Sequence, residues 1–313
     1  MTKVGQFPAE QTHQGEFKRQ PDEFRDWVRA DGSTPFRPER GRYHLYVSLA
    51  CPWAHRTLIV RRLKQLDEAI GVTVVDPVRD ERGWAFRDGH GHTRDPLNGF
   101  AYLSEAYTAT NPNFGGRWTV PVLWDRHTRR IVNNSEDDIC RMFNDEFPAG
   151  GDAAPNLFPA TVAEDQTALS QEIYERVNNG VYRAGFATQQ RAYERAVRDL
   201  FAMLDTLESR LGTRRYLFGR DFVEADWRLF CTLVRFDAVY HGHFKCNLRR
   251  IVDYRHLQGY LQDLYQIPGV AHTVNFDHIK RHYYVTHTQI NPTQIVPLGP
   301  ELHLSAPHGR EKL

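Results

Sequence analysis

Apolar and polar residues between positions 43 and 147 switch between the spacing of strands and the spacing of helices. The stretch 43–49 has the alternation and the β-rich composition of a strand. After a tight turn, an amphipathic run extends to Leu66 and is predicted to be a helix. Further strands are predicted over 71–77, 119–125 and 130–132, and a second helix over 135–147. This order predicts an α/β unit of about 110 residues with a long insertion before its third strand.

Beyond a small-residue segment at 149–155, the chain shows only helical periodicity. Helices are predicted over 163–178, 190–211, 224–240, 257–266 and 270–284, which indicates an all-α bundle. The expected fold class is therefore an α/β domain followed by an all-helical domain. The expected divisions are an irregular N-terminal extension without a catalytic motif (1–40), the α/β domain (41–150), a linker (151–165), the helical domain (166–290) and a C-terminal tail (291–313).

Composition adds limits on partners and location. The 313 residues suggest about two domains at roughly 150 residues each. The net charge is +1, with 40 basic and 39 acidic residues spread along the chain, which argues against nucleic acid as a partner. No apolar stretch approaches the roughly 18 residues of a membrane helix, so a soluble protein is expected. A polar N-terminus without a secretory signal and four cysteines without paired spacing favour the reducing cytoplasm.

Cys51 lies in the predicted turn between the first strand and the first helix, and Pro52 follows it directly. Free N–H groups and the dipole at a helix N-terminus favour a thiolate there. Dithiol oxidoreductases carry a second cysteine three residues later, where this chain has Ala54, so an external thiol must complete any reaction. Most cytosolic cysteines are buried fillers, and that interpretation is preferred for Cys140, Cys231 and Cys246.

The segment 48–59 around Cys51 resembles the active-site segment of the glutathionyl-hydroquinone reductases, the Xi class of the glutathione transferase superfamily. The resemblance covers about residues 40–300, with further blocks in the same order at 83–86, 117–125, 178–187, 224–230, 242–250 and 275–284. It implies a thioredoxin-like N-terminal domain, an all-helical glutathione-transferase C-terminal domain and a homodimer. It also implies glutathione as the co-substrate.

The reaction that the resemblance implies is the reductive removal of glutathione from glutathionyl-hydroquinones. The Cys51 thiolate would attack the glutathione sulfur, the hydroquinone would leave and take a proton, and a second glutathione would free Cys51 from the mixed disulfide. Two alternatives stay open: a general deglutathionylating thiol transferase that acts on disulfides, and a non-catalytic protein of this fold that binds aromatic ligands.

The resemblance also implies roles for residues of the N-terminal domain. The Val120–Pro121 peptide is expected to be cis, with the Val120 backbone pairing with the cysteinyl part of glutathione. Trp84 and Arg117 are expected to contact the tripeptide, Arg117 through its fork of donors. Without the resemblance, Pro121 could equally be an edge-strand proline, Trp84 a core aromatic residue and Arg117 a surface charge.

The chain departs from the family pattern where glutathione is held by its γ-glutamyl end. The family's Glu-Ser pair is inverted here to Ser135–Glu136, and Asp137 and Asp138 follow. Three carboxylates in a first helical turn compete with an anionic ligand for the helix dipole, although one of them can pair with the ligand's ammonium group. We therefore expect weaker glutathione affinity, and a thiol without that carboxylate, such as a sugar thiol, is an alternative donor.

A second departure concerns the start of the helix at 224. The family has Thr or Ser three residues before Asp226, and this chain has Val223, whose side chain cannot cap. A cost of about 1 kcal/mol is expected unless Asp221 takes over.

Three tyrosines of the helical domain, Tyr182, Tyr240 and Tyr283, resemble those that line the family's quinol pocket, and they are expected to converge near Cys51. The alternative is three core tyrosines with satisfied hydroxyls. His278 and His282 have i, i+4 spacing, but no glutamate follows the first and no third ligand is near, so no metal is expected. The glycines at 89 and 91 do not form a dinucleotide fingerprint, so no nucleotide is expected either.

Overall fold

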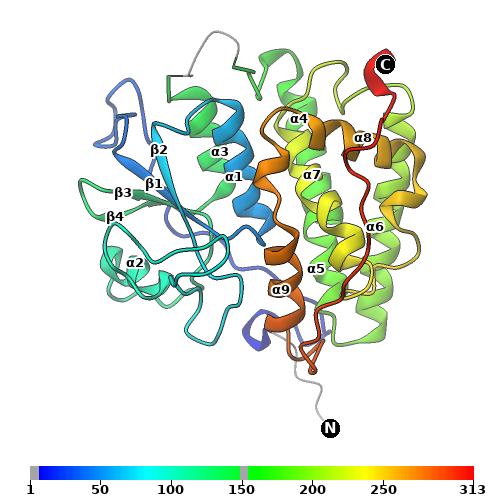
Figure 1. Cartoon of the computed structure of the whole chain (residues 1–313), viewed down its shortest axis with the longest axis horizontal. Helices are drawn as coiled ribbons and strands as arrows, with labels where there is room; N and C mark the ends of the chain where they lie inside the picture. Colours follow the sequence, from blue (N-terminus) through cyan, green and yellow to red (C-terminus); the bar gives the residue numbers. More distant parts are fainter. Residues whose placement is uncertain (1–6, 149–153) are drawn as a thin grey trace. The chain divides into compact units, whose positions relative to one another are not determined.

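The computed structural model describes residues 7–148 and 154–313, so parts of the predicted N-terminal extension and linker lie outside the described residues. The chain divides into two compact units (Figure 1). The sheet unit contains the described residues of Gln20–Asn156 together with His272–His282. The helical unit contains Leu157–Ala271, Tyr283–Leu313 and the N-terminal residues up to Arg19.

The sheet unit is built on four strands in the order β2-β1-β3-β4. β1 pairs in parallel with β2 and antiparallel with β3, and β3 pairs antiparallel with β4. All five residues of β1 are buried, so the alternation in its sequence does not correspond to an exposed face of the strand. The strands are β1 (Tyr43–Val47), β2 (Ile70–Val74), β3 (Val122–Asp125) and β4 (Arg130–Asn133).

Three helices accompany the sheet: α1 (Pro52–Leu63), α2 (Leu103–Thr110) and α3 (Glu136–Asp145). α1 and α3 pack against each other and α2 packs against β4, so the two groups lie on opposite sides of the sheet (Figure 1). Helix α2 lies in the long insertion that the sequence predicts before the third strand, where no helix was predicted. Its start is held by the Glu105 carboxylate, which accepts the backbone N–H groups of Ala101 and Tyr102 at 2.9 Å.

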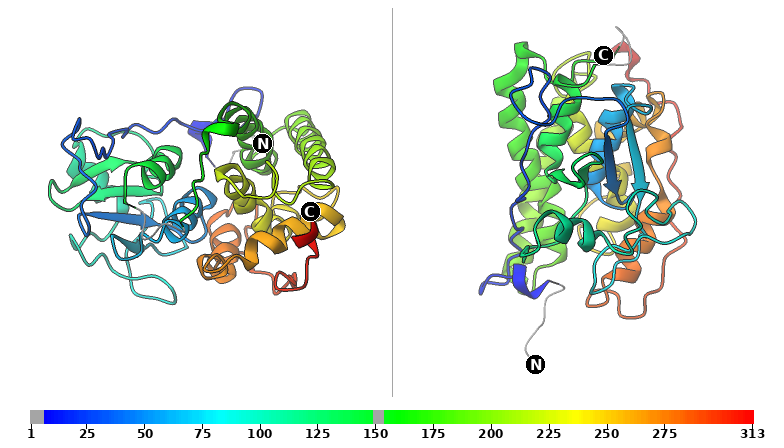
Figure 2. Two further views of the ribbon diagram at one scale, coloured as in Figure 1. Left: turned by 90° about the horizontal axis from the view of Figure 1, so that it is seen from above. Right: turned by 90° about the vertical axis from the view of Figure 1, so that its left-hand side faces the viewer.

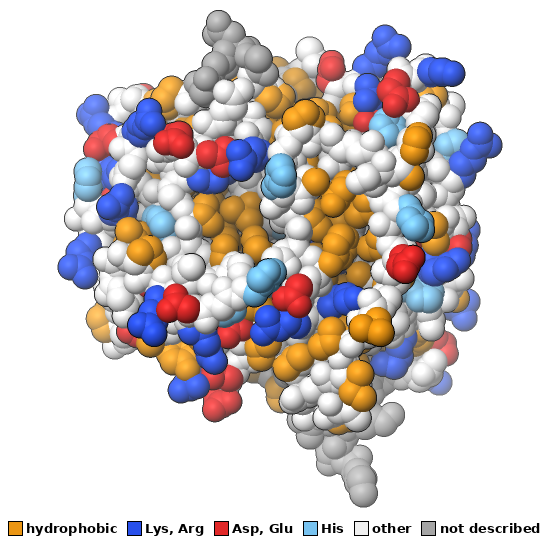
Figure 3. Space-filling model, in the orientation of Figure 1, with side chains coloured by type: hydrophobic (Ala, Val, Ile, Leu, Met, Phe, Trp, Pro, Cys, Tyr) orange, Lys and Arg blue, Asp and Glu red, His pale blue; other side chains and the backbone are white. Residues whose placement is uncertain are grey.

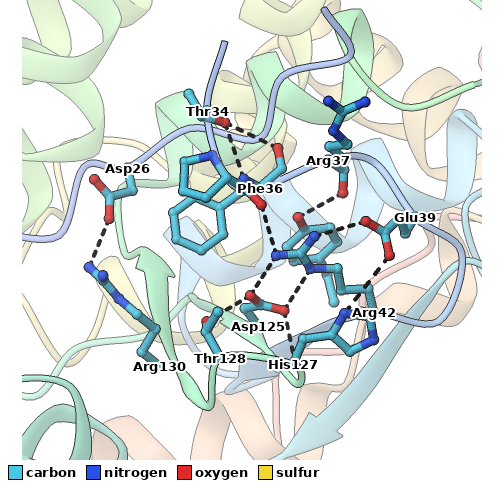
Figure 4. Close-up of polar contacts among 12 residues, drawn as sticks. Asp26, Thr34, Phe36, Arg37, Glu39, Arg42, Asp125, His127, Thr128 and Arg130 are labelled. Carbon is cyan, nitrogen blue, oxygen red and sulfur yellow. Dashed lines mark hydrogen bonds and ion pairs between the residues drawn. The ribbon is translucent and has the colours of Figure 1, made fainter. Parts of the chain in front are cut away.

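A buried ion pair joins the start of β1 to the end of β3 (Figure 4). Arg42 donates from Nε and Nη2 to the Asp125 carboxylate, each at 2.9 Å, and also to the Pro35 carbonyl at 3.1 Å. Burial alone would raise the pKa of Asp125, but hydrogen bonds from Arg42 and Thr128 hold it below its usual range. The pair therefore fixes the segment before β1 to the sheet through a charge-assisted contact.

The helical unit is a bundle in which α6 packs against α5 and α8, and α7 against α4 and α8. Two predicted helices end in π-helical segments, η3 (Ile173–Asn178) and η4 (Phe236–Tyr240). Helix α5 was not predicted. Helix α9 begins at Phe276 and not at 270 as predicted, because the Asn275 side chain accepts the N–H of His278 at 2.9 Å. The α-helices of this unit are α4 (Ala163–Glu172), α5 (Gly180–Gly185), α6 (Gln190–Leu211), α7 (Glu224–Arg235) and α8 (Arg255–Gln266). The last helix, α9 (Phe276–Thr286), belongs to the sheet unit up to His282 and to the helical unit from Tyr283.

Short 3-10 turns complete the chain: η1 (Pro8–Glu10), η2 (Ala160–Val162), η5 (Ile251–Asp253), η6 (Ala271–Thr273) and η7 (Arg310–Lys312).

Helix α7 begins without a side-chain cap from Val223. Asp221 is exposed and does not replace the missing cap. Instead the Asp226 carboxylate reaches back and accepts the N–H of Val223 at 2.8 Å and that of Leu217 at 2.9 Å. Half of a capping box therefore remains at this helix start.

Basic and acidic side chains are interspersed over the face drawn in Figure 3, as the balanced charge predicts. Among the described residues, no helix combines the length and the apolar composition needed to cross a membrane.

Candidate active site

Cys51 is the N-cap residue of α1, and Pro52 is the first residue of the helix. The extended backbone at Cys51 lets its carbonyl accept the N–H of His55 at 2.9 Å, while its own N–H bonds the Ser48 carbonyl at 3.1 Å. The side chain is partly buried, whereas Cys140, Cys231 and Cys246 are buried as expected. Cys51 thus combines a helix N-terminus with access to solvent, the setting of a reactive thiol.

The loop before β3 supplies the wall beside this thiol. The Cys51 Sγ lies 3.6 Å from the Val120 carbonyl oxygen and can donate to it. The Val120–Pro121 peptide bond is cis, as the family resemblance implies. Arg117 lies earlier in the same loop with a partly exposed side chain. The structure therefore brings Cys51 and the Val120–Pro121 pair together, and it leaves the role of Arg117 a prediction.

Trp84 is buried and contacts His282, which is distant in sequence, and Arg79, which is five residues away. The His282 ring stacks on it at 4.9 Å between centroids and 25° between planes, and the Arg79 guanidinium carbon lies 5.7 Å from its ring. His282 Nδ1 donates to the Pro77 carbonyl at 2.7 Å. Sequence reasoning missed this positioning role, because the only available signal was the i, i+4 spacing of His282 with His278.

The histidine pair on α9 contacts protein carbonyls. His278 Nε2 donates to the His90 carbonyl at 2.7 Å. His282, four residues later in the same helix, donates to the Pro77 carbonyl. Within residues 7–148 and 154–313, no group of three or more His, Cys, Asp or Glu side chains is arranged to hold a metal ion.

The N-terminus of α3 carries the predicted acidic turn, and Ser135 is its N-cap residue. The Arg56 guanidinium, only 3% exposed, bonds Glu136 at 2.9 Å and Asp137 at 2.6 Å. Arg25 donates hydrogen bonds from both Nε and Nη2 to the Asp138 carboxylate. Two guanidinium groups thus offset the three carboxylates, a compensation that the helical sequence alone did not reveal.

Glu136 sits in a strongly perturbed environment. Burial raises the pKa of Glu136 to about 7, with Arg56 acting to lower it and Asp137 acting to raise it. A carboxyl group that titrates near neutrality can receive an ammonium group when ionised and loses that ability when protonated. Ser135 is also buried, and its N–H donates to the Asn133 side chain at 2.8 Å.

The three tyrosines converge on one another within the helical unit. The Tyr240 hydroxyl lies 2.8 Å from that of Tyr283 and 3.4 Å from that of Tyr182, and the Tyr182 and Tyr283 hydroxyls are in direct contact. Burial raises the pKa values of Tyr240 and Tyr283 well above the ordinary range, so both hydroxyls are protonated and can donate near neutral pH. Their approach to Cys51 remains a prediction.

Comparison with known proteins gives the family. Residues 50–146 match the glutathione S-transferase N-terminal domain, and residues 190–263 match the glutathione S-transferase C-terminal domain. Glutathionyl-hydroquinone reductase YqjG of Escherichia coli is 50% identical over 304 residues, covering 95% of this chain and 93% of the relative.

Solved structures agree over nearly the same length. The glutathione-bound structure of YqjG has a TM-score of 0.89 and 51% identity, covering 92% of this chain and 96% of that one. The Xi-class glutathione transferase of Natrialba magadii has a TM-score of 0.91 and 50% identity, covering 93% of this chain and 89% of that one. The chain therefore belongs to the glutathione S-transferase family and, within it, to the Xi class that contains the glutathionyl-hydroquinone reductases.

Proposed function

We propose that this protein is a glutathione-dependent reductase that removes glutathione from glutathionyl-hydroquinones, with Cys51 as the nucleophile. The observation that carries the proposal is the partly buried thiol at the N-terminus of α1, 3.6 Å from the Val120 carbonyl. The 50% identity to a glutathionyl-hydroquinone reductase supports the same activity.

In the first step, the Cys51 thiolate attacks the glutathione sulfur of the aryl thioether. The sulfur–carbon bond breaks, its electron pair goes to the ring carbon, and that carbon takes a proton to give the hydroquinone. A Cys51–glutathione disulfide remains. The ring is reduced by two electrons, and the two sulfurs are oxidised together.

In the second step, the thiolate of free glutathione attacks the mixed disulfide at the sulfur of the bound glutathione. Oxidised glutathione leaves and the Cys51 thiolate is restored. Position 54 is an alanine, so no neighbouring thiol competes for the mixed disulfide. The net reaction consumes one glutathionyl-hydroquinone and one glutathione and yields one hydroquinone and one oxidised glutathione.

The residues proposed to hold glutathione are Trp84, Arg117, Val120, Ser135 and Glu136. The α3 N-terminus is suited to the γ-glutamyl carboxylate through its backbone N–H groups, and Glu136 to the α-ammonium group. Arg56 limits the repulsion between the acidic turn and the anionic part of the ligand.

One observation supports an alternative thiol donor in place of glutathione. Asp137 is half-exposed in the first turn of α3, so the turn keeps a carboxylate in contact with solvent. A thiol without a carboxylate at this place, such as a sugar thiol, avoids that repulsion.

The quinol pocket is proposed to include Tyr182, Tyr240 and Tyr283. Aromatic side chains can stack on the quinol ring, and protonated hydroxyls can donate to its oxygens or supply the proton that the ring carbon takes. We also propose that the protein is a homodimer and that it works in the cytoplasm, where its four free cysteines would stay reduced.

Steady-state rates on two substrates test the proposal. We expect turnover of a glutathionyl-hydroquinone with equal amounts of hydroquinone and oxidised glutathione formed, and much slower turnover of a mixed disulfide of glutathione. Cys51→Ala should abolish the first activity, and Cys246→Ala, which alters a buried thiol, serves as the matched control. Faster reaction with the disulfide would favour the general thiol transferase, and binding without turnover would favour the ligand-binding protein.

A further inference from the structure

The N-terminal arm, residues 7–19, is built into the helical unit (Figure 2). Gln11 Nε2 donates to the Phe186 carbonyl at 2.9 Å, and Glu16 forms an ion pair with Arg195 at 2.6 Å. The Phe17 ring packs edge-on against the Phe186 ring at 5.2 Å. These contacts hold the arm beside α5, the helix that carries Tyr182.

Gly15 sets the path of the arm at its closest approach to this unit. Its φ of +75° lies in the left-handed region, and a Cβ there would lie 2.7 Å from Gln189 Cγ and 2.8 Å from Thr188 Oγ1. The Gly15 carbonyl accepts the N–H of Thr188 at 3.1 Å. Only glycine fits here without strain, so the arm follows one defined course.

The arm ends at Arg19, a cation beside the tyrosine cluster, which consists of Tyr182, Tyr240 and Tyr283. The Arg19 guanidinium carbon lies 5.5 Å from the centroid of the Tyr182 ring and 6.0 Å from that of Phe17. Its Nε donates to Asn179 Oδ1 at 3.3 Å, which fixes the direction of the side chain. The residue is partly exposed, and the Tyr182 hydroxyl contacts that of Tyr283.

We propose that Arg19 is a specificity-determining residue that binds a carboxylate on the ring of the quinol substrate. The inference rests on the proposed function, because it takes the tyrosine cluster as the quinol pocket. The Tyr240 and Tyr283 side chains are fully buried and their hydroxyls bond each other at 2.8 Å, so Tyr182 is the least buried member of the cluster. Arg19 adds a planar cation at the edge of the same cluster, and a guanidinium binds a carboxylate through paired hydrogen bonds.

Paired substrates test the inference. The glutathione adducts of benzoquinone and of carboxybenzoquinone differ only by the ring carboxylate, and the ratio of their KM values reports the contribution of that group. We expect Arg19→Gln to shift the ratio against the carboxylated substrate by about tenfold, which corresponds to about 1.4 kcal/mol. Arg19→Lys, which keeps the charge but loses the fork, should restore part of the preference.

A control separates the charge of Arg19 from the position of the arm. Arg195→Gln breaks the ion pair with Glu16 and leaves Arg19 in place, so it should change both KM values in the same proportion. An unchanged ratio in Arg19→Gln would overturn the inference, as would an equal shift in Arg195→Gln.

A measurement of hydroquinone binding tests the inference without requiring turnover. The dissociation constants of naphthohydroquinone and carboxynaphthohydroquinone, measured without oxygen by calorimetry, should show the same shift in Arg19→Gln. If the wild-type protein does not turn over the glutathione adducts, the proposed function fails while this ratio still decides the role of Arg19. Equal shifts for both ligands would show a purely structural contact with Tyr182.

Discussion

At the residue scale, the α3 N-terminus is the place where the proposed function puts the γ-glutamyl end of the thiol donor. Arg56 bonds both Glu136 and Asp137, so the acidic turn carries less uncompensated charge than its sequence suggests. The inversion of Ser135 and Glu136 still places the carboxylate one position later than in the family pattern. An ammonium group would have to reach that later position, and the hydroxyl of Ser135 takes the earlier one.

The double exchange Ser135→Glu with Glu136→Ser tests the effect of the inversion. We expect the KM for glutathione to fall about two- to fivefold, because the exchange moves the carboxylate and returns a hydroxyl to the first turn, where single dipole contacts contribute about 0.3–1 kcal/mol. The rate of hydroquinone release at varied glutathione concentration measures it, with Glu136→Ser alone as the control. No improvement in KM would mean that the inversion has no effect on glutathione.

Glu136 also predicts a pH dependence. Its pKa near 7 means that the side chain is largely protonated below that pH and ionised above it, so its attraction for an ammonium group appears as pH rises. We expect the dissociation constant of S-methylglutathione, which has no free thiol, to fall about tenfold from about pH 6 to about pH 8.

Two variants control this measurement by calorimetry. Glu136→Gln cannot titrate and should remove the pH dependence. Asp137→Asn removes a charge that raises the pKa of Glu136, so it should move the midpoint to lower pH. A midpoint that stays in place in both variants would assign the dependence to another group.

At the element scale, the start of α7 retains only half of a capping box. Val223→Thr adds a hydroxyl that can accept an N–H group of the first turn, so we expect a gain of about 0.5–1 kcal/mol in unfolding free energy. Thermal or denaturant unfolding measures the gain, and Val223→Ala, which removes buried methyl groups without adding a cap, should destabilise. Equal destabilisation by both variants would show that packing outweighs the cap at this position.

Elements with strong local signals could be predicted from the sequence, whereas weaker ones could not. The first strand, the turn at Cys51 and the long helix α6 follow from periodicity and from Pro52. Helix α2 has only eight residues, and its start depends on Glu105, so no extended period marked it. Two predicted helices end in π-helical segments, which the helical spacing of their apolar residues did not indicate.

The candidate site divides in the same way. Cys51 and the Val120–Pro121 pair each lie within a short sequence motif, and they were predicted from the sequence and the family resemblance. Arg56, His282 and Arg19 were missed, because each acts on a partner at least 80 positions away: Glu136, Trp84 and Tyr182. Such pairings depend on the fold, so a single sequence gives no direct signal for them.

At the scale of the whole molecule, the homodimer is a direct prediction. Light scattering after size exclusion should give a mass of about twice 36.4 kDa at micromolar concentration. A mass of 36.4 kDa under the same conditions would contradict the dimer. Comparing wild type with Cys51→Ala excludes a dimer formed through a disulfide at the partly exposed thiol.

The whole account depends on a covalent intermediate at Cys51. Mass spectrometry of the protein after reaction with a glutathionyl-hydroquinone, without free glutathione, tests it most directly. We predict one added glutathionyl group per chain, located on the peptide that contains Cys51, with an equal amount of hydroquinone released and the adduct removed by added glutathione. An unmodified Cys51 together with released hydroquinone, or full turnover by Cys51→Ala, would contradict the account.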